Sequence, residues 1–398
     1  MIEAGDQVPP HLPPVAALVD AEMARVSREF DWLRAVTPYG AQDLWEEFRS
    51  GSFKSTPRFQ YRNPGIDIAA TRKRLLALPV REIEDPLFKA LLAEKQRELD
   101  RQLELVELRG TDGFLQASTD LFGTATPDLH ADAQHILDAV PPAPNVTVRF
   151  ADAACVNEAA LKQFEYYRSK CPDFSANVRY SQNVTAGLMV SNNTLFVSED
   201  ARIPRERLDA LLHHEIGTHI LTWHNGGHQP LRQLQTGLAH YDELQEGIGV
   251  LAEYLAGNLS PLRLRTLAAR VVAVRLLTDG AGFPEVFDVL RSGHRFRGRS
   301  AFIITTRVFR GGGLTKDVVY LRGLKRLLSY LREDCAFQEL LIGKFSLSQL
   351  PAIRKLANAG WLEPPRLMPA YTHNAAARQR LAECVQVPLD RLYQRLVA

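Results

Sequence analysis

One short segment of the chain concentrates the residue types that bind metals and transfer protons. Residues 211–219 read LLHHEIGTH, in which His214 and Glu215 are followed by His219. The pattern is similar to H-E-x-x-H, where two imidazoles bind zinc and the glutamate takes a proton from water, but one additional residue separates the histidines. The chemistry expected of such residues is hydrolysis assisted by a metal ion.

The additional residue changes the geometry of the motif. In a regular α-helix, positions five apart differ by about 140° around the axis, so His214 and His219 would not face the same ion. A π-bulge adds one residue to a turn and returns both side chains to one face, and such bulges often occur at functional sites. Gly217 lies between the histidines and is a poor helix former, so we expect the bulge there.

The alternative is a buried helix with incidental histidines. A carboxylate and an imidazole on a core-facing stripe cost free energy unless they are paired or bound to metal, and Glu215 and His219 fall within such a stripe. His213, His224 and His228 are rival ligands, and we interpret each as a surface or supporting residue. The apolar stripe consists of Leu208, Leu211, Leu212, Ile216, Ile220 and Trp223.

A zinc site with two histidines needs a third ligand and an open position for water. The next helical segment, YDELQEGIGVLAEYL, offers Glu243, Glu246 and Glu253. Asp242 and Gln245 have the spacing of a capping box, which would place Glu246 in the first turns. Glu246 and Glu253 lie opposite the apolar stripe of this helix, a position that suits a solvent-exposed residue as well as a ligand. Periodicity therefore does not choose among the three glutamates.

Positive charge is concentrated in one part of the sequence. Between Arg263 and Arg332 there are 15 basic and 4 acidic residues, a net charge of +11, whereas the whole chain carries +2. This excess is typical of a face that meets an acidic partner, or of arginines that extend from buried helices. We do not expect a nucleic-acid partner, because no helix-turn-helix signature or aromatic-interleaved basic motif is present.

The rest of the chain must supply the elements that position these residues. We expect a flexible proline-rich arm over 1–14, a helical region over 15–139 and a mixed domain over 146–398 that ends in helices. One helix should begin at Asp85 and end before Gly110. The segments NVTVRFADA, NVRYSQNV, GLMVSNNTLFV and AFIITTRVF read as short strands, so the predicted fold class is α+β.

Composition and patterning limit the class of protein. The 398 residues, 45% of them hydrophobic, suffice for two or three domains at about 150 residues each. No apolar run reaches the roughly 18 residues of a membrane span, and the N-terminus has acids where a signal peptide needs positive charge. The four cysteines show no CxxC spacing. We therefore expect a cytoplasmic protein without a membrane partner.

The segments HHEIGTH, NGGHQP and LQEGIGVLAEY together resemble the microtubule-associated tyrosine carboxypeptidase family and its bacterial relatives, the QEGLA-motif proteins. The resemblance extends to LRGTDGFLQASTDLFG and RVFRGGGLTKDVVYLRG and covers residues from about 60 to 370. It implies a zincin-like metallopeptidase domain with a small sheet and active-site helices. It also implies one Zn2+ per chain, with His214, His219 and Glu246 as ligands and Glu215 as the catalytic base. The departure is QEGIG for QEGLA, which changes no ligand.

The function that follows from this resemblance is a zinc metallocarboxypeptidase. Zinc-bound water activated by Glu215 would hydrolyse the C-terminal peptide bond of a protein or peptide, and an acidic tail would suit the basic segment. The substrate carboxylate needs a cation, for which Arg310, then Lys316 and Arg307, are candidates, with Tyr320 as a hydroxyl donor. On the predicted strand, Arg307 and Arg310 would face opposite sides, and a strand followed by a glycine turn needs no substrate to explain it.

Two other functions remain open at this point. One is a zinc endopeptidase of the same fold, which would not require a free C-terminus in its substrate. The other is a non-catalytic regulator or nucleic-acid binder that uses the basic segment 263–332. A serine or cysteine hydrolase is not expected, because the sequence contains no GxSxG motif and no cysteine next to a histidine.

Overall fold

The N-terminal part of the chain is helical, as predicted. The computed structural model describes residues 11–142, 148–182, 187–333 and 336–394, so residues 1–10 of the predicted arm lie outside it. Helix α5 begins where its sequence signals indicate, because the Asp85 carboxylate accepts hydrogen bonds from the first backbone N–H groups of the helix. The helices of this part are α1 (Pro14–Glu29), α2 (Trp32–Ala35), α3 (Ala41–Ser50), α4 (Ile68–Leu76), α5 (Pro86–Glu107), α6 (Phe114–Phe122) and α7 (Pro127–Ala139).

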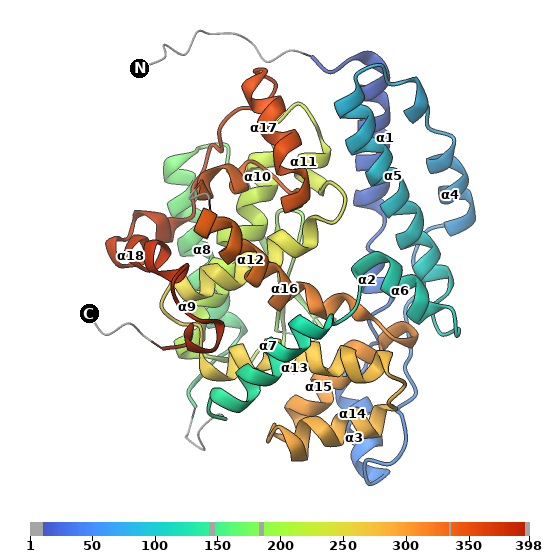
Figure 1. Cartoon of the computed structure of the whole chain (residues 1–398), viewed down its shortest axis with the longest axis vertical. Coiled ribbons are helices and arrows are strands. Elements are labelled where there is room, and N and C mark those ends of the chain that lie inside the picture. The colour runs from blue at the N-terminus through green and yellow to red at the C-terminus, as the bar shows by residue number, and fades with distance from the viewer. Residues whose placement is uncertain (1–10, 143–147, 183–186, 334–335, 395–398) are drawn as a thin grey trace.

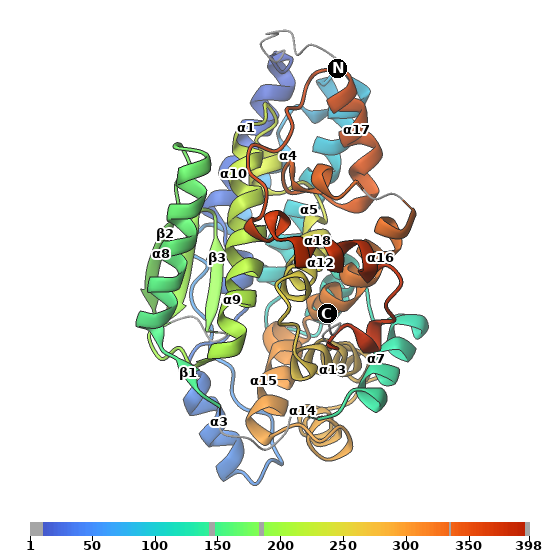
Figure 2. The same cartoon turned by 90° about the vertical axis from the view of Figure 1, so that its left-hand side faces the viewer.

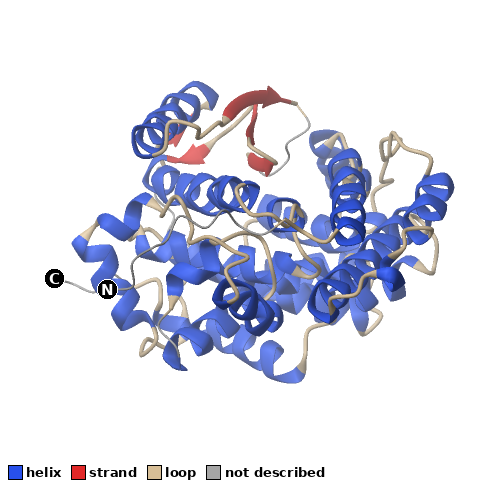
Figure 3. Ribbon diagram, turned by 90° about the horizontal axis from the view of Figure 1, so that it is seen from above, coloured by secondary structure: helices blue, strands red, loops and turns tan. Residues whose placement is uncertain are grey.

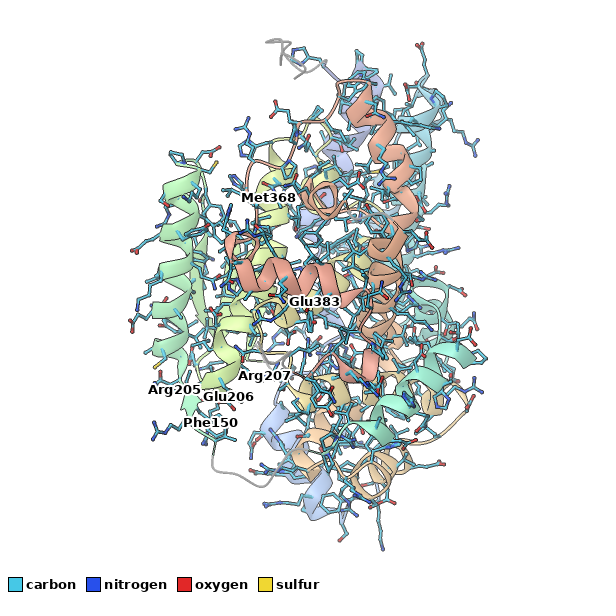
Figure 4. The ribbon with its side chains drawn as sticks, turned by 60° about the vertical axis from the view of Figure 1, so that its left-hand side comes forward. Phe150, Arg205, Glu206, Arg207, Met368 and Glu383 are labelled. Atoms are coloured by element: carbon cyan, nitrogen blue, oxygen red, sulfur yellow. The ribbon has the colours of Figure 1, made fainter. Side chains whose placement is uncertain are left out.

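Two small sheets follow. In the three-stranded sheet the order is β2-β4-β3, with β2 parallel and β3 antiparallel to β4, and β1 pairs with β5. Figure 4 shows Phe150 of β1 beside Arg205 and Glu206, where α9 begins. Residues 143–147 and 183–186, which include part of the segment between the predicted regions 15–139 and 146–398 and parts of two predicted strands, lie outside the described residues. The elements are β1 (Phe150–Ala151), α8 (Ala153–Lys170), β2 (Asn177–Ser181), β3 (Leu188–Ser191), β4 (Thr194–Ser198) and β5 (Ile203–Pro204).

The remaining described chain is helical, so small sheets and many helices make the predicted α+β fold. Within the described ranges, none of the helices is long and apolar enough to cross a membrane. The helices are α9 (Arg205–His214), a π-helical turn (Glu215–Ile220), α10 (Leu221–Gly227), α11 (Gln233–Thr236), α12 (Tyr241–Leu255), α13 (Pro261–Thr278), α14 (Phe283–Asp288), α15 (Gly298–Phe309), α16 (Val319–Glu333), α17 (Leu350–Asn358) and α18 (Ala375–Cys384).

The strand predicted for AFIITTRVF is wrong, because these residues form most of α15. Phe302 packs against the rings of Trp45 and Phe48. β-branched residues lower helix propensity by less than about 1 kcal/mol each, so burial of an apolar helical face outweighs them. Arg307 consequently lies in the last turn of a helix and Arg310 begins a 3-10 turn, rather than the two facing opposite sides of a strand. The buried residues repeat with helical spacing: Ala301, Phe302, Ile304, Thr305 and Val308.

Helix α12 lies in the centre of the molecule. Figure 1 shows α1 and α5 side by side at one side of the molecule, and α13 and α15 below α12. In Figure 2, α8 and the three-stranded sheet form one outer layer, α9 and α10 run beside the sheet, and α16 lies beyond α12. Seen from above, the strands gather at one edge of a mostly helical molecule (Figure 3). Helix α12 contacts α9, the π-helical turn and α16.

Two glycines allow α12 and α16 to cross with their backbones in contact. A Cβ atom added at Gly247 would lie 2.7 Å from the carbonyl carbon of Gly323. A Cβ atom added at Gly323 would lie 2.1 Å from the carbonyl oxygen of Glu243. No side chain fits between these backbones, so the crossing fixes the depth at which α12 presents its polar residues.

We expect Gly323→Ala to lower the free energy of unfolding by about 1–3 kcal/mol or more, because the added methyl group meets backbone that cannot rotate away. Gly293→Ala is the matched control, since the nearest atom to its Cβ would be 4.0 Å away. Urea unfolding of both variants measures the effect. Equal midpoints for the two variants would contradict the close crossing.

Candidate metal centre

The helix that carries HHEIGTH contains the predicted π-bulge. Helix α9 ends at His214, residues Glu215–Ile220 form the π-helical turn, and α10 continues the same helix to Gly227. The extra residue in this turn brings the two imidazoles to one side, with ring centroids 5.1 Å apart. A regular α-helix would have turned the imidazoles of His214 and His219 away from each other.

Helix α12 supplies a carboxylate that faces both imidazoles. Glu246 Oε2 lies 3.4 Å from His214 Nε2 and 3.9 Å from His219 Nε2. One donor atom from each of the three residues lies within 4.8 Å of the others. Glu243, which the sequence left open as a third ligand, instead forms ion pairs with arginines of α16. The three converging residues are therefore His214, His219 and Glu246.

The second nitrogen of each imidazole is held by another side chain. His214 Nδ1 lies 2.9 Å from Glu253 Oε1, and His219 Nδ1 lies 3.3 Å from Gln245 Oε1. A neutral imidazole whose Nδ1 donates in such a bond keeps its lone pair on Nε2, the atom that faces Glu246 in both residues. Carboxylate and carbonyl partners of this kind orient histidine ligands and raise their basicity at metal sites. The donor set therefore fits a metal ion.

The predicted capping box of Asp242 and Gln245 is wrong. Helix α12 begins at Tyr241, and no side chain caps its N-terminus. Asp242 Oδ1 lies 2.9 Å from Lys316 Nζ, and Gln245 Oε1 accepts a hydrogen bond of 2.8 Å from Thr222 Oγ1. Both side chains therefore make tertiary contacts at the centre instead of capping their own helix.

Glu253 is a buried support of the centre rather than a solvent-exposed residue. Its side chain is 0% exposed, and Arg263 and Arg207 pair with it at 2.9 and 3.4 Å. Burial raises the pKa of Glu253, but Arg263 and His214 outweigh burial and lower it below the usual range. For His214, burial lowers the pKa, and the hydrogen bonds to Glu246 and Glu253 outweigh burial and raise it to about 10.

Glu215, the predicted base, lies directly after His214 in the π-helical turn and is partly exposed. Burial raises the pKa of Glu215, the nearby charges of Glu246 and Glu253 raise it further, and His214 opposes them, for a value of about 7. A carboxyl group with a pKa near neutrality suits proton transfer in both directions.

Gly249 is part of the centre, because the absence of a side chain there lets a neighbouring helix approach α12 closely. A Cβ atom at this position would lie 2.6 Å from Nε2 and from Cε1 of His214. The imidazole of His214 therefore rests directly on the backbone of α12. The glycine of QEGIG leaves the space that this ring occupies.

The residues predicted to bind substrate gather next to the centre. Lys316 Nζ lies 3.9 Å from Glu246 Oε1, and Lys316 and Arg307 each have their charge 6.0 Å from the centroid of the Tyr320 ring. Arg310 is buried, and its guanidinium donates a hydrogen bond of 3.2 Å to Thr37 Oγ1. The positive cluster therefore lies on the Lys316 side of Glu246.

Asp317 is the acidic residue around which the arginines of this cluster gather. Arg307 binds Asp317 through two hydrogen bonds of 2.6 and 2.7 Å, and Arg310 and Arg270 lie 3.9 and 3.5 Å from its oxygens. Nε and one terminal nitrogen of Arg270 are buried without a hydrogen-bond partner among the described residues. The Arg270 guanidinium also lies 4.8 Å from the centroid of the Tyr320 ring. Three guanidinium groups share one carboxylate, so this group of side chains carries a net positive charge.

Arg270 was not among the residues that the sequence indicated as substrate-binding. The sequence feature that could have identified it is an arginine surrounded by apolar residues in LAARVVAVRLL, where a charge is costly unless it has a partner.

The other histidines named as rival ligands do not join the centre. His213 lies against the Tyr371 ring with centroids 5.5 Å apart, and His224 and His228 lie against each other at 4.7 Å.

We expect Asp317→Asn to lower the free energy of unfolding by about 3–5 kcal/mol, because it leaves buried guanidinium groups without their counter-charge. Asp279→Asn is the matched control: Asp279 pairs with Arg275 at 2.7 Å, but its side chain is 51% exposed. This control should change stability by less than about 1 kcal/mol. Chemical denaturation measures both variants, and similar losses in the two would refute the buried network.

Comparison with known proteins agrees with the resemblance seen in the motifs. The model of the family described as microtubule-associated tyrosine carboxypeptidase matches residues 46–387. No curated protein matches the chain significantly. The family match includes the π-helical turn, α12 and the arginine cluster around Asp317. Because it spans nearly the whole sequence, the chain belongs to the microtubule-associated tyrosine carboxypeptidase family.

Proposed function

We propose that the protein is a zinc-dependent carboxypeptidase in which His214, His219 and Glu246 bind one Zn2+. The observation that carries this proposal is the π-helical turn, which brings both Nε2 atoms to the Glu246 carboxylate. Two imidazoles and one carboxylate are a frequent ligand set of catalytic zinc, and they leave one position open. Glu253 and Gln245 support the proposal because each places an oxygen next to Nδ1, where it can accept a hydrogen bond and orient a histidine that binds metal through Nε2.

The small sheet supports a zincin-like arrangement of the catalytic domain. Strand β3 lies at the edge of the three-stranded sheet and contacts the π-helical turn. Figure 2 shows β3 as the labelled strand nearest α9. An edge strand has backbone groups free to pair with an extended peptide, so β3 can align a substrate beside the centre.

The proposed mechanism assigns proton transfer to Glu215. Bound zinc would lower the pKa of its water to about 7 and polarise the scissile carbonyl. Glu215 accepts the proton of the attacking water and then donates it to the leaving amine, which suits its pKa of about 7. Burial raises the pKa of Glu246, but His214 and Lys316 outweigh burial and keep this carboxylate ionised for its role as a ligand.

The arginine cluster favours an exopeptidase over an endopeptidase. We propose that Arg270 and Arg310 receive the C-terminal carboxylate of a protein or peptide, since both guanidinium groups contain buried N–H donors that make no hydrogen bond in the described part of the chain. Tyr320 lies against Arg270 and can add a hydroxyl donor. A planar guanidinium matches a carboxylate with two parallel hydrogen bonds. Because Arg270, Arg307 and Arg310 are turned into the molecule, these three residues of the basic segment do not contribute to a nucleic-acid surface.

We expect His214→Ala and His219→Ala each to lose most bound zinc, whereas Glu215→Gln keeps zinc near the wild-type level and lowers turnover by about 100-fold or more. Glutamine retains the size of glutamate but cannot accept the proton. Glu243→Gln, on α12 but paired with α16, is the control and should retain both zinc and turnover. Metal analysis and peptide hydrolysis are the measurements. Full zinc occupancy in both histidine variants would overturn the ligand assignment, and retained turnover in Glu215→Gln would exclude it as the base.

We expect the wild type to cleave a free-acid peptide about 10- to 150-fold better than its C-terminal amide, measured as kcat/KM. Arg270→Ala and Arg310→Ala should lose this preference. Arg275→Ala, in the same helix as Arg270 but paired with exposed Asp279, should keep it. The ratio of acid to amide cleavage does not depend on how much enzyme is folded.

Equal cleavage of the acid and the amide by the wild type would contradict the carboxypeptidase function and favour an endopeptidase. If both arginine variants keep the preference for the free acid, Arg307 or Lys316 would be the residue that binds the substrate carboxylate.

A further inference from the structure

A second group of metal-binding residue types lies at the C-terminal end of α10. Cys171 follows α8 directly, Asp173 comes two residues later, and His224 and His228 lie in and just after the last turn of α10. Cys171 Sγ is 3.6 Å from His224 Nε2, and Asp173 Oδ2 is 3.1 Å from His228 Nε2. One donor atom each from Cys171, Asp173 and His224 lies within 4.8 Å of the others. None of these residues belongs to the first centre.

We propose that Cys171, Asp173 and His224 bind a second zinc ion with a structural role, and that His228, which lies outside this group but against Asp173, is the fourth ligand. Thiolate, imidazole and carboxylate are the ligands that zinc takes in tetrahedral sites. Tetrahedral bonds of about 2.0–2.3 Å place neighbouring donor atoms about 3.5 Å apart. The sulfur–nitrogen separation of 3.6 Å is close to this value, and the oxygen–nitrogen separation of 3.1 Å is somewhat shorter. A set that includes a thiolate and two imidazoles selects zinc over magnesium or calcium.

The contact between Cys171 and Asp173 agrees with binding to a metal. The thiol donates a hydrogen bond of 2.7 Å to Asp173 Oδ1. Metal binding removes the thiol proton to solvent, so this contact lengthens toward the edge of a tetrahedron. Asp173 is exposed, which lets its carboxylate turn and gives an ion a path of entry. Arg366 stays at the rim, 3.8 Å from Asp173 Oδ2, and also pairs with Glu363.

The surroundings hold the imidazoles in position for this role. His224 is buried, and its ring packs at a steep angle against Phe174 with centroids 5.3 Å apart. The last carbonyl groups of a helix carry partial negative charge, which favours a cation at the end of α10. An ion here connects the end of α8 to the helix that carries His214 and His219. It therefore braces the catalytic helix from its C-terminal end.

Co2+ is the probe for this site, because a cobalt–thiolate bond absorbs in the near ultraviolet and the first centre contains no thiolate. The full-length protein, freed of metal by chelation, is titrated with Co2+. We expect the thiolate absorption to reach a plateau at one thiolate-bound cobalt per chain, within a total of two bound cobalt ions. A wild-type protein that binds cobalt without this absorption overturns the proposal.

Variants separate this site from the first centre. Cys171→Ser should remove the absorption, and Cys155→Ser, the matched control at another partly exposed free cysteine, should keep it. The double variant His214→Ala, His219→Ala should also keep it, so failure of the first centre is distinguishable. His228→Ala, at a side chain 23% exposed, should weaken thiolate-bound cobalt at least about ten-fold. Absorption that persists in Cys171→Ser, or wild-type affinity in His228→Ala, overturns the second site.

Discussion

The structure of the centre depends on one interaction, the pairing of buried carboxylates on α12 with imidazoles across the π-helical turn. His214 contacts Glu246 through Nε2 and Glu253 through Nδ1. Neither carboxylate could remain ionised inside the molecule without these partners and the cations behind them. The pairing therefore holds α12 and the helix that carries His214 and His219 in one relative position, and it brings the donor atoms of both helices together.

The pairing requires a very close approach of helices, and glycines make that approach possible. Gly249 lets the His214 ring rest on the backbone of α12, while Gly247 and Gly323 let α16 approach α12 from the other side. Each glycine lowers helix propensity by about 1 kcal/mol relative to alanine. Close contact between the helices offsets this cost. Glycine thus occurs in α12 where a side chain would separate His214 from Glu246.

The arginine cluster around Asp317 differs from the centre in how its buried charges are hydrogen-bonded. Glu253 accepts hydrogen bonds from Arg263 and Arg207, and Nε of Arg207 has no partner, whereas two nitrogens of Arg270 are buried without a hydrogen-bond partner in the described chain. An unmatched buried cation costs stability, and such a cost is typical of a functional site that awaits an anionic ligand. The cluster lies beside Glu246, so binding of an anion and hydrolysis would occur next to each other.

Local sequence determined the features that depend on neighbouring residues. The N-terminus of α5 follows from Asp85, and the π-helical turn follows from two histidines five residues apart around Gly217. Periodicity could not distinguish Glu246 from Glu243 and Glu253, because the contacts that separate them come from other helices.

Only the tertiary structure decided the remaining features. It turned AFIITTRVF into a helix, since burial of one apolar face against distant aromatic rings exceeds the small propensity of β-branched residues for strands. It also brought Arg270 to Asp317, and Cys171 to His224, which are separated by 47 and 53 residues in the sequence. Spacing along the chain carries no information about such pairs, because their contact depends on how whole helices pack.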